Sequence, residues 1–213
     1  MNIITMVSST FFILSLIFSS SYALMQDFCV ADYKAPTSPA GYSCKNPSDV
    51  KVDDFVFSGL GVPSNSSNIN KVGIKAAFVA QYPGLNGLGL ALARGDFEVG
   101  GVVPLHTHFA SEAILVAEGK VIAGFIASDN KAYVKTLKKG DVMVLPRGLL
   151  HFQVNAGDTR ALVFATFSSD DPGVQYLENA LFQNDFHTDL IAKTTLLDTA
   201  EIKKLKALLG GTN

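Results

Sequence analysis

Three of the four histidines in the chain lie in two short segments, with a glutamate beside them. The first segment holds His106, His108 and Glu112, and the second holds His151. Histidine is the commonest metal ligand, and a carboxylate added to imidazoles suits a metal of intermediate hardness. The residue types therefore predict a metal site whose ligands are these four side chains.

The spacing of the four residues fits strands of a β-sheet. Alternate side chains of a strand share a face, so His106 and His108 are expected to point the same way. Glu112 opens an apolar run that predicts the neighbouring strand, across from the histidines. A Pro-Arg-Gly turn at 146–148 delivers His151 to the start of a further strand. If the metal is six-coordinate, two positions stay open, as in a reactive site rather than a purely structural one.

Plainer interpretations of the same residues stay open. A histidine on an apolar strand is often a hydrogen-bonded core residue, but two separate segments with fixed glycines favour metal binding. Asn155 shares strand parity with His151 and is a candidate donor to a metal-bound ligand, or else it closes the strand end. Gln153 is either a contact just outside the metal ligands or an ordinary strand residue.

The two segments resemble the two sequence motifs of the cupin family. From Gly100 to Gly119 the glycines, the His-x-His pair and the glutamate match the first motif, and from Gly140 to Asn155 the chain matches the second. More specifically, the chain resembles plant germin-like proteins, and among these the auxin-binding subgroup. The likeness covers nearly all of the chain after its first residues. It is carried further by the segments 26–32, 41–45, 52–60 and 148–153.

This resemblance implies an all-β fold, a single jelly-roll barrel or monocupin. It implies that Mn²⁺ is held by His106, His108, Glu112 and His151. It also implies a homo-oligomer, a hexamer built as a trimer of dimers.

The resemblance and the site together suggest four functions. Germin-like proteins are often superoxide dismutases, and manganese with open coordination positions suits that reaction. True germins are oxalate oxidases with two asparagines near the substrate; one matches Asn86, but the other falls at Val103, which cannot donate a hydrogen bond. The auxin-binding subgroup implies a carboxylate hormone held near the metal. The fourth possibility is a stable cell-wall protein with an incidental metal.

Residues 1–23 are predicted to be a secretory signal peptide. The segment has no charged side chain, its apolar core is too short for a membrane span, and Ser21-Tyr22-Ala23 resembles a cleavage site. The alternative is a buried N-terminal strand. No later stretch is long and apolar enough to anchor the chain. The protein is therefore expected to be secreted to the extracellular space, the apoplast or cell wall.

The remaining composition agrees with a secreted domain. A net charge of -2 predicts no general attraction to nucleic acid. The only two cysteines, Cys29 and Cys44, are expected to form a disulfide that stabilises the fold by roughly 3 kcal/mol. Asn65 opens an Asn-Ser-Ser glycosylation sequon in a polar, loop-like run.

The chain divides into three expected regions after the leader. Residues 24–60 are predicted to form an N-terminal arm that the disulfide clips onto the barrel, residues 61–168 the barrel, and residues 169–213 a helical extension. Helices are expected after Asp171-Pro172, from Thr188 through Ile191, and after Asp198. The predicted strands are 76–81, 88–94, 97–103, 112–117, 121–126, 133–137, 141–145, 150–154 and 161–167.

Overall fold

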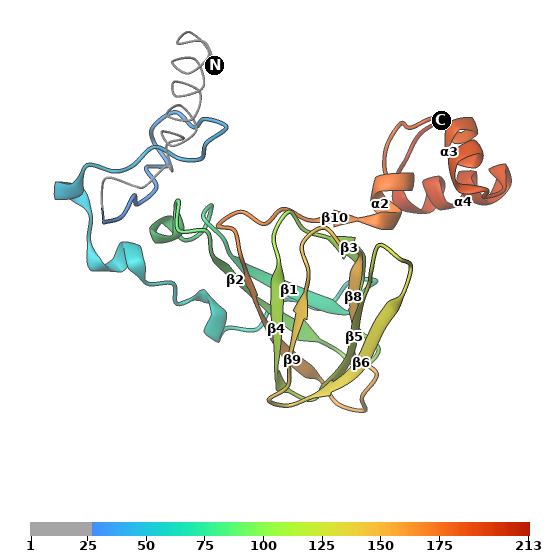
Figure 1. Ribbon diagram of the computed structural model, residues 1–213, viewed down its shortest axis with the longest axis horizontal. Coiled ribbons are helices and arrows are strands. Elements are labelled where there is room, and N and C mark those ends of the chain that lie inside the picture. The colour runs from blue at the N-terminus through green and yellow to red at the C-terminus, as the bar shows by residue number, and fades with distance from the viewer. Residues whose placement is uncertain (1–26) are drawn as a thin grey trace, which may run out of the picture.

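The computed structural model describes residues 27–213, and it folds them around two antiparallel five-stranded sheets that face each other (Figure 1). The predicted signal peptide at 1–23 lies outside the described residues. The prediction of an all-β barrel with a disulfide-clipped arm and C-terminal helices is confirmed. The first sheet has the order β1 (Val72–Ala77), β2 (Ala91–Phe97), β9 (Ala161–Phe167), β4 (Glu112–Glu118), β7 (Val142–Leu145). The second has the order β10 (Gln175–Tyr176), β3 (Val102–Thr107), β8 (His151–Val154), β5 (Lys120–Ile126), β6 (Ala132–Lys138).

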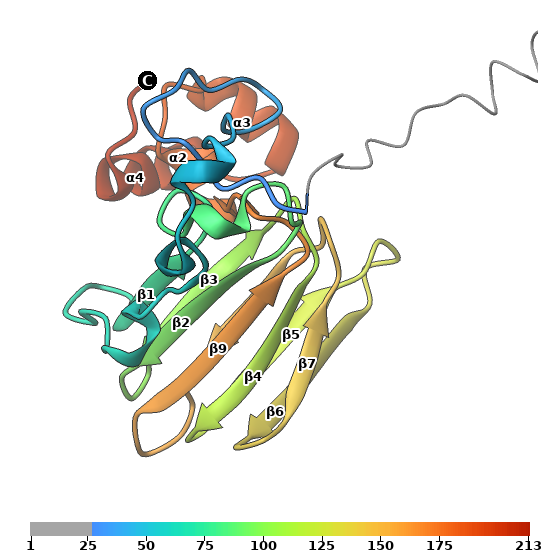
Figure 2. The ribbon, with the colours of Figure 1, turned by 90° about the vertical axis from the view of Figure 1, so that its left-hand side faces the viewer.

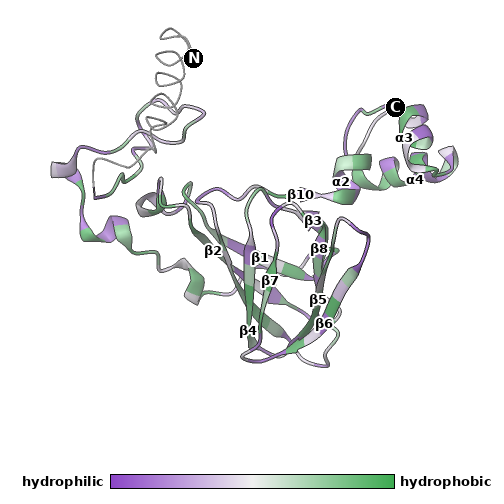
Figure 3. Cartoon of the chain, viewed as in Figure 1, coloured by the Kyte–Doolittle hydropathy of each residue, from purple (hydrophilic) through white to green (hydrophobic). Residues whose placement is uncertain are grey.

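The core lies between the two sheets because alternate residues of each strand point inward. Along β4 and β9 every second side chain is buried, including Ile114, Val116 and Val163. From the second sheet, Val121 and Ala123 of β5 meet them. Apolar residues accordingly dominate the strands in Figure 3. This period-two pattern is the signal from which the barrel was predictable.

Strands from Glu112 onward begin and end within one or two residues of their predicted positions, but the first three are displaced. The segment predicted as strand 76–81 turns after β1, where the Tyr82 N–H donates to the Phe78 carbonyl, and continues into the 3-10 helix η4 (Pro83–Leu85). The run predicted as strand 97–103 is split between β2 and β3. A turn at Gly100, whose φ of 74° suits glycine, separates the two strands.

The disulfide between Cys29 and Cys44 closes a loop within the N-terminal arm. Hydrogen bonds, rather than the disulfide itself, attach the arm to one end of the barrel. Beside the disulfide, the Ala31 N–H donates to the Pro83 carbonyl of η4. Three short 3-10 helices follow along the arm: η1 (Pro47–Asp49), η2 (Val52–Phe55) and η3 (Gly59–Gly61). Figures 1 and 2 show the arm and the C-terminal helices at the same end of the barrel. The prediction of this disulfide is confirmed.

The segment after β9 stays extended where a helix was expected. Asp171-Pro172 does not start a helix, because Gln175 and Tyr176 instead pair with Thr107 and His106 as strand β10. The helix α2 (Leu177–Phe182) begins only after this strand. The barrel thus recruits a strand from the predicted helical extension.

The last helices pack mainly on one another. Helix α3 (Thr188–Thr195) runs four residues beyond its predicted end. Helix α4 (Thr199–Leu209) is capped by Asp198, whose carboxylate accepts from the Ala200 N–H. Phe182, Ile191 and Ile202 form the small core of these helices. Figure 1 shows the helices to one side of the barrel end. In residues 27–213 we find no helix long and apolar enough to cross a membrane.

Candidate metal centre

The fold brings the four predicted ligands together between the two sheets. One ligand atom from each of His106, His108, Glu112 and His151 lies within 4.8 Å of the others, and all four residues are buried. His106 and His151 are paired residues of β3 and β8, and His108 follows the end of β3. Glu112 begins β4, which lies in the opposite sheet and is not paired with the strands that carry the histidines. The group therefore bridges the two sheets.

A β-bulge aims His106 into the barrel. Val103 pairs with Gln153 and His106 with His151, so three steps along β3 match two steps along β8. The extra residue falls at the Pro104–Leu105 part of the strand, where a proline without an N–H costs little because pairing is already broken. As a result both Val103 and His106 are buried on the inner side.

Backbone carbonyls orient the three imidazoles. The Nδ1 atoms of His106 and His151 are each 2.8 Å from a carbonyl oxygen, of Pro104 and Leu149 respectively, and His108 Nδ1 contacts the Gly173 carbonyl. A carbonyl can only accept, so each Nδ1 carries the hydrogen. In the neutral ring Nε2 then presents a lone pair, which is the arrangement of metal-binding histidines.

The carboxylate of Glu112 meets two of these rings. Its Oε2 lies 3.1 Å from His151 Nε2 and 3.4 Å from His108 Nε2. Two nitrogen lone pairs and a carboxylate repel one another at such distances unless a positive charge lies between them. That charge is either protons or a metal ion. Three imidazole nitrogens and one carboxylate oxygen fit a divalent transition metal.

Burial shifts the titration of the cluster in the metal-free protein. Burial, and then the nearby His151, lowers the pKa of His106 from 6.5 to about 4. Burial alone would raise the pKa of Glu112, but hydrogen bonds from His108 and His151 outweigh it and lower the value from 4.5 to about 2. At neutral pH His106 is therefore an uncharged ligand and Glu112 an ionised one.

These shifts predict that the metal-free protein loses stability as pH falls. The unfolded chain protonates His106 near pH 6.5 and the folded chain only near pH 4, so folding becomes less favourable through this window. The loss is on the order of 3 kcal/mol for a shift of this size. Glu112 adds a second loss between its two values, 4.5 and about 2. Thermal unfolding of chelator-treated protein from pH 7 to pH 4 measures the first window.

The matched variants for this measurement are His106→Gln and His187→Ala. His106→Gln is expected to flatten the pH dependence of stability between pH 6.5 and pH 4. His187→Ala changes an exposed histidine and should leave that dependence unchanged. The lowered carboxyl pKa values of Asp54 and Asp96 act below about pH 4, outside this window. A wild-type melting temperature that does not fall toward pH 4 contradicts the assignment.

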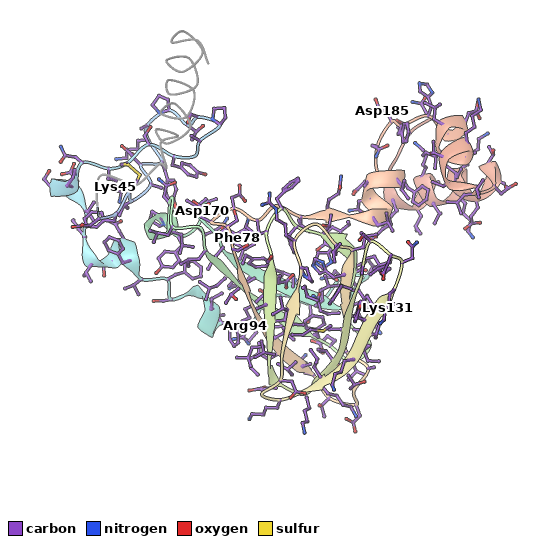
Figure 4. The ribbon with its side chains drawn as sticks, in the orientation of Figure 1. Lys45, Phe78, Arg94, Lys131, Asp170 and Asp185 are labelled. Carbon is purple, nitrogen blue, oxygen red and sulfur yellow. A yellow bond between two sulfur atoms is a disulfide. The ribbon has the colours of Figure 1, made fainter. Side chains whose placement is uncertain are left out.

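An apolar cavity of about 140 Å³ adjoins the cluster. Small inward residues of β1, β2 and β9 leave this space: Ala76, Ala93, Gly95 and Ala165. Phe78 and Phe167 close part of the wall, with ring centroids 5.6 Å apart. Figure 4 shows Phe78 at the end of the barrel nearest the arm. The cavity could therefore hold a largely apolar ligand with one end at the cluster.

Two polar side chains line this cavity besides three of the candidate ligands, His106, His108 and Glu112. Gln153 is 3% exposed, and its Nε2 has no hydrogen-bond partner among the described residues. Its position in the cavity wall favours the interpretation as a contact beside the ligands over that of an ordinary strand residue. The second is Tyr176 of β10, which the sequence analysis did not single out. The pattern at Asp171-Pro172 predicted a helix here, so Tyr176 was not expected on a strand. Its pairing with His106 follows only from the fold.

The two asparagines proposed as neighbours of the site lie elsewhere. The Asn86 amide donates to the Tyr42 carbonyl and to Cys29 Sγ, so it holds the arm against the barrel. The Asn155 amide donates to the carbonyls of Phe97, Glu98 and Thr159, and its Oδ1 accepts from the Gly157 N–H. Asn155 thus closes the strand end and keeps no hydrogen for a metal-bound ligand.

Comparison with known proteins agrees with this fold and cluster. The family model described as Cupin matches residues 58–203. The chain belongs to the cupin family.

Within that family the relatives are germin-like. The chain is 62% identical over 209 residues to auxin-binding protein ABP19a of Prunus persica, covering 98% of this chain and 100% of that protein. It is 58% identical over 207 residues to a germin-like protein of Morus alba, covering 97% of this chain and 99% of that protein. The chain is thus a germin-like protein of the group that includes these auxin-binding proteins.

A solved structure shares the fold nearly throughout. Recombinant oxalate oxidase in complex with glycolate superposes with a TM-score of 0.84 at 34% identity, covering 87% of this chain and 96% of that chain. The similarity extends over the barrel and beyond it, because the coverage exceeds the strands alone.

Proposed function

We propose that the chain binds manganese through His106, His108, Glu112 and His151 and dismutates superoxide. The observation that carries the proposal is the convergence of three carbonyl-oriented imidazoles and a carboxylate in a buried group beside a cavity. Manganese in such a mixed shell would supply the electron exchange that converts superoxide to dioxygen and peroxide. Raw affinity favours copper or zinc, so manganese loading depends on the ligand set and on metal supply.

The residues of the chain contribute binding, orientation and exclusion of water. The backbone carbonyls of Pro104 and Leu149 fix the rings of His106 and His151, so the ligand set is preorganised before the metal arrives. The burial of the four side chains and the apolar cavity wall limit the access of bulk water to the cluster.

The test is a parallel assay of metal content and superoxide removal on one purified sample. The rate of removal should rise in proportion to manganese occupancy as the metal-free protein is reloaded. A fully loaded sample without activity contradicts the dismutase proposal while leaving the metal assignment intact.

The alternative function is auxin binding without catalysis. Relatives named auxin-binding proteins motivate it, and the mostly apolar cavity fits an aromatic carboxylate better than a fully polar ligand. The carboxylate would meet the metal and the ring would lie against the apolar wall, with Gln153 Nε2 free to donate to the ligand. If the protein also removes superoxide, indole-3-acetate that reaches the metal should inhibit that reaction competitively.

We further propose that the protein is secreted to the plant apoplast or cell wall and glycosylated at Asn65. The apolar, uncharged start of the chain and the disulfide support secretion. Asn65 is exposed, and its side-chain oxygen accepts from the Ser67 N–H in a local turn. Both features suit a surface sequon.

Secretion predicts a specific mature product. Mass spectrometry should find a chain beginning near Leu24, with a glycan at Asn65 and no alkylatable thiol before reduction. An intact Met1 would contradict the leader, and two cysteines alkylated without reduction would contradict the disulfide in the secreted protein.

We also propose that the protein assembles as a homo-oligomer, a hexamer arranged as a trimer of dimers. Its support is an exposed apolar face on the outside of the first sheet. Val142, Val144 and Leu115 are 61%, 59% and 40% exposed, and the strand register places them on one side of β4 and β7. A contiguous exposed apolar sheet face is typical of protein interfaces.

A further inference from the structure

Tyr176 lies in the same cross-sheet row as two of the candidate metal ligands. Its strand β10 pairs it with His106, and β8 in turn pairs His106 with His151. Directly paired residues of a sheet project to the same face, so all three side chains enter the barrel at one level. The ring centroids of Tyr176 and His106 are 5.5 Å apart.

The Tyr176 side chain is half-buried in the wall of the cavity that adjoins the cluster. Its hydroxyl makes no hydrogen bond to another residue in the range 27–213. The hydroxyls of Tyr33 and Tyr82, in contrast, donate to the carbonyls of Val79 and Phe55. A phenol ordinarily titrates near pH 10, so at neutral pH this hydroxyl is a donor. The row therefore presents a donor with no protein partner next to the group that would hold the metal.

A purely structural role would need only the ring. Packing beside His106 requires an aromatic or apolar surface, which phenylalanine would supply without placing a polar group in an apolar cavity. The half-buried hydroxyl adds a polar group to the cavity wall that packing does not require. A molecule bound beside the cluster would share this cavity with the hydroxyl and could accept its hydrogen.

We propose that Tyr176 is a specificity-determining residue for anionic ligands at the metal, and that its hydroxyl donates a hydrogen bond to an oxygen of the bound anion. This inference rests on the proposed manganese site. The ligand class is a small oxygen anion, such as a carboxylate. Ligands without an acceptor oxygen gain nothing from the hydroxyl, so the residue selects for anions of this kind.

Formate binding to the manganese-loaded protein tests the proposal. Formate displaces water from bound manganese, and water-proton relaxation follows that displacement without an enzymatic assay. Tyr176→Phe keeps the ring and removes the hydroxyl, and it should weaken formate binding about tenfold, the effect of one hydrogen bond to a charged group. Manganese content should stay at the wild-type level.

Two further variants separate the hydroxyl from the ring. Tyr133→Phe also removes one phenol hydroxyl, but Tyr133 stacks on Phe125 outside the cavity. This variant should therefore leave formate affinity unchanged. Tyr176→Leu removes both ring and hydroxyl. Weakening by Tyr176→Leu but not by Tyr176→Phe would show that packing alone matters and would overturn the proposal.

The failure of this inference differs from the failure of the proposed function. Equal formate affinity of wild type and Tyr176→Phe, with full manganese content in both, overturns the role of Tyr176 only. Wild-type protein that takes up no manganese overturns the metal site and this inference with it.

Discussion

Replacing His151 with alanine is expected to remove most of the bound manganese, with an affinity at least about 100-fold lower than that of wild type. The residue is 1% exposed, and its Nε2 faces the Glu112 carboxylate at 3.1 Å. Changes to groups that merely orient a ligand already cost about 10-fold to 100-fold in metal affinity, so the loss of a ligand should cost at least as much. Metal analysis after dialysis against a weak chelator measures the effect.

Controls separate loss of a ligand from loss of the fold. His151→Gln keeps most of the side-chain volume and should also lose the metal, which argues against a cavity effect. His187→Ala removes the one histidine outside the cluster, an exposed residue before α3, and should retain wild-type occupancy. Full manganese occupancy in a folded His151→Ala protein would show that the four-residue assignment is wrong.

The cluster could be predicted because its information is local. His106 and His108 are two residues apart, a turn precedes His151, and an apolar run follows Glu112, so local patterns were enough to predict that these residues belong to one site. The barrel was predictable for the same reason, since β4 and β9 alternate between buried and more accessible residues. Local patterns determine which face of a strand a residue occupies.

Local patterns do not determine which strands become neighbours. Glu112 reaches the histidines across the barrel from the opposite sheet, an arrangement fixed by the packing of two sheets. The bulge between Val103 and His106 depends on pairing with β8. Tyr176 joins the site because a short strand forms after Pro172, at a place where capping rules favour a helix. Tertiary pairing overrides the local preference at each of these positions.

The resemblance to oxalate oxidases suggested that Asn86 lies near the substrate, but in the structure its side chain attaches the arm to the barrel. Its amide donates to the Tyr42 carbonyl and to Cys29 Sγ, which lies in the disulfide. These contacts span more than forty residues of sequence, and no local pattern indicates them. Its side chain serves the attachment of the arm in this structure.

The manganese-loaded protein is expected to remove superoxide and to produce little or no peroxide from oxalate. Superoxide is small and carries one charge, so it needs only an open position at the metal. Oxalate carries a second carboxylate, which must lie in the cavity. The residues that line the cavity in the described part of the chain include no lysine or arginine. Val103, 6% exposed and paired with Gln153, offers no donor.

A missing donor to a buried charged group costs about 1–3 kcal/mol or more. The loss falls on the transition state as well as on binding, so it lowers turnover and not only affinity. Gln153 Nε2 and, on the proposal above, the Tyr176 hydroxyl can each donate one hydrogen bond, but Val103 and Ile114 add no donor to this wall. Parallel assays of superoxide removal and oxalate-dependent peroxide on one sample, with manganese content measured, compare the two reactions directly.

Val103→Asn is the matched variant, because asparagine is close to valine in size and adds an amide donor to the same wall. It should bind oxalate more tightly than wild type while manganese content stays equal, since Val103 is not among the four metal ligands. Robust peroxide production from oxalate by the wild-type protein would contradict the argument from Val103. If neither reaction occurs at full manganese occupancy, the apolar cavity is better explained as a binding site for an aromatic carboxylate. Superoxide dismutation, oxalate oxidation and the binding of an aromatic carboxylate would all use the same four metal ligands. The residues of the cavity wall therefore determine which of these functions the protein has.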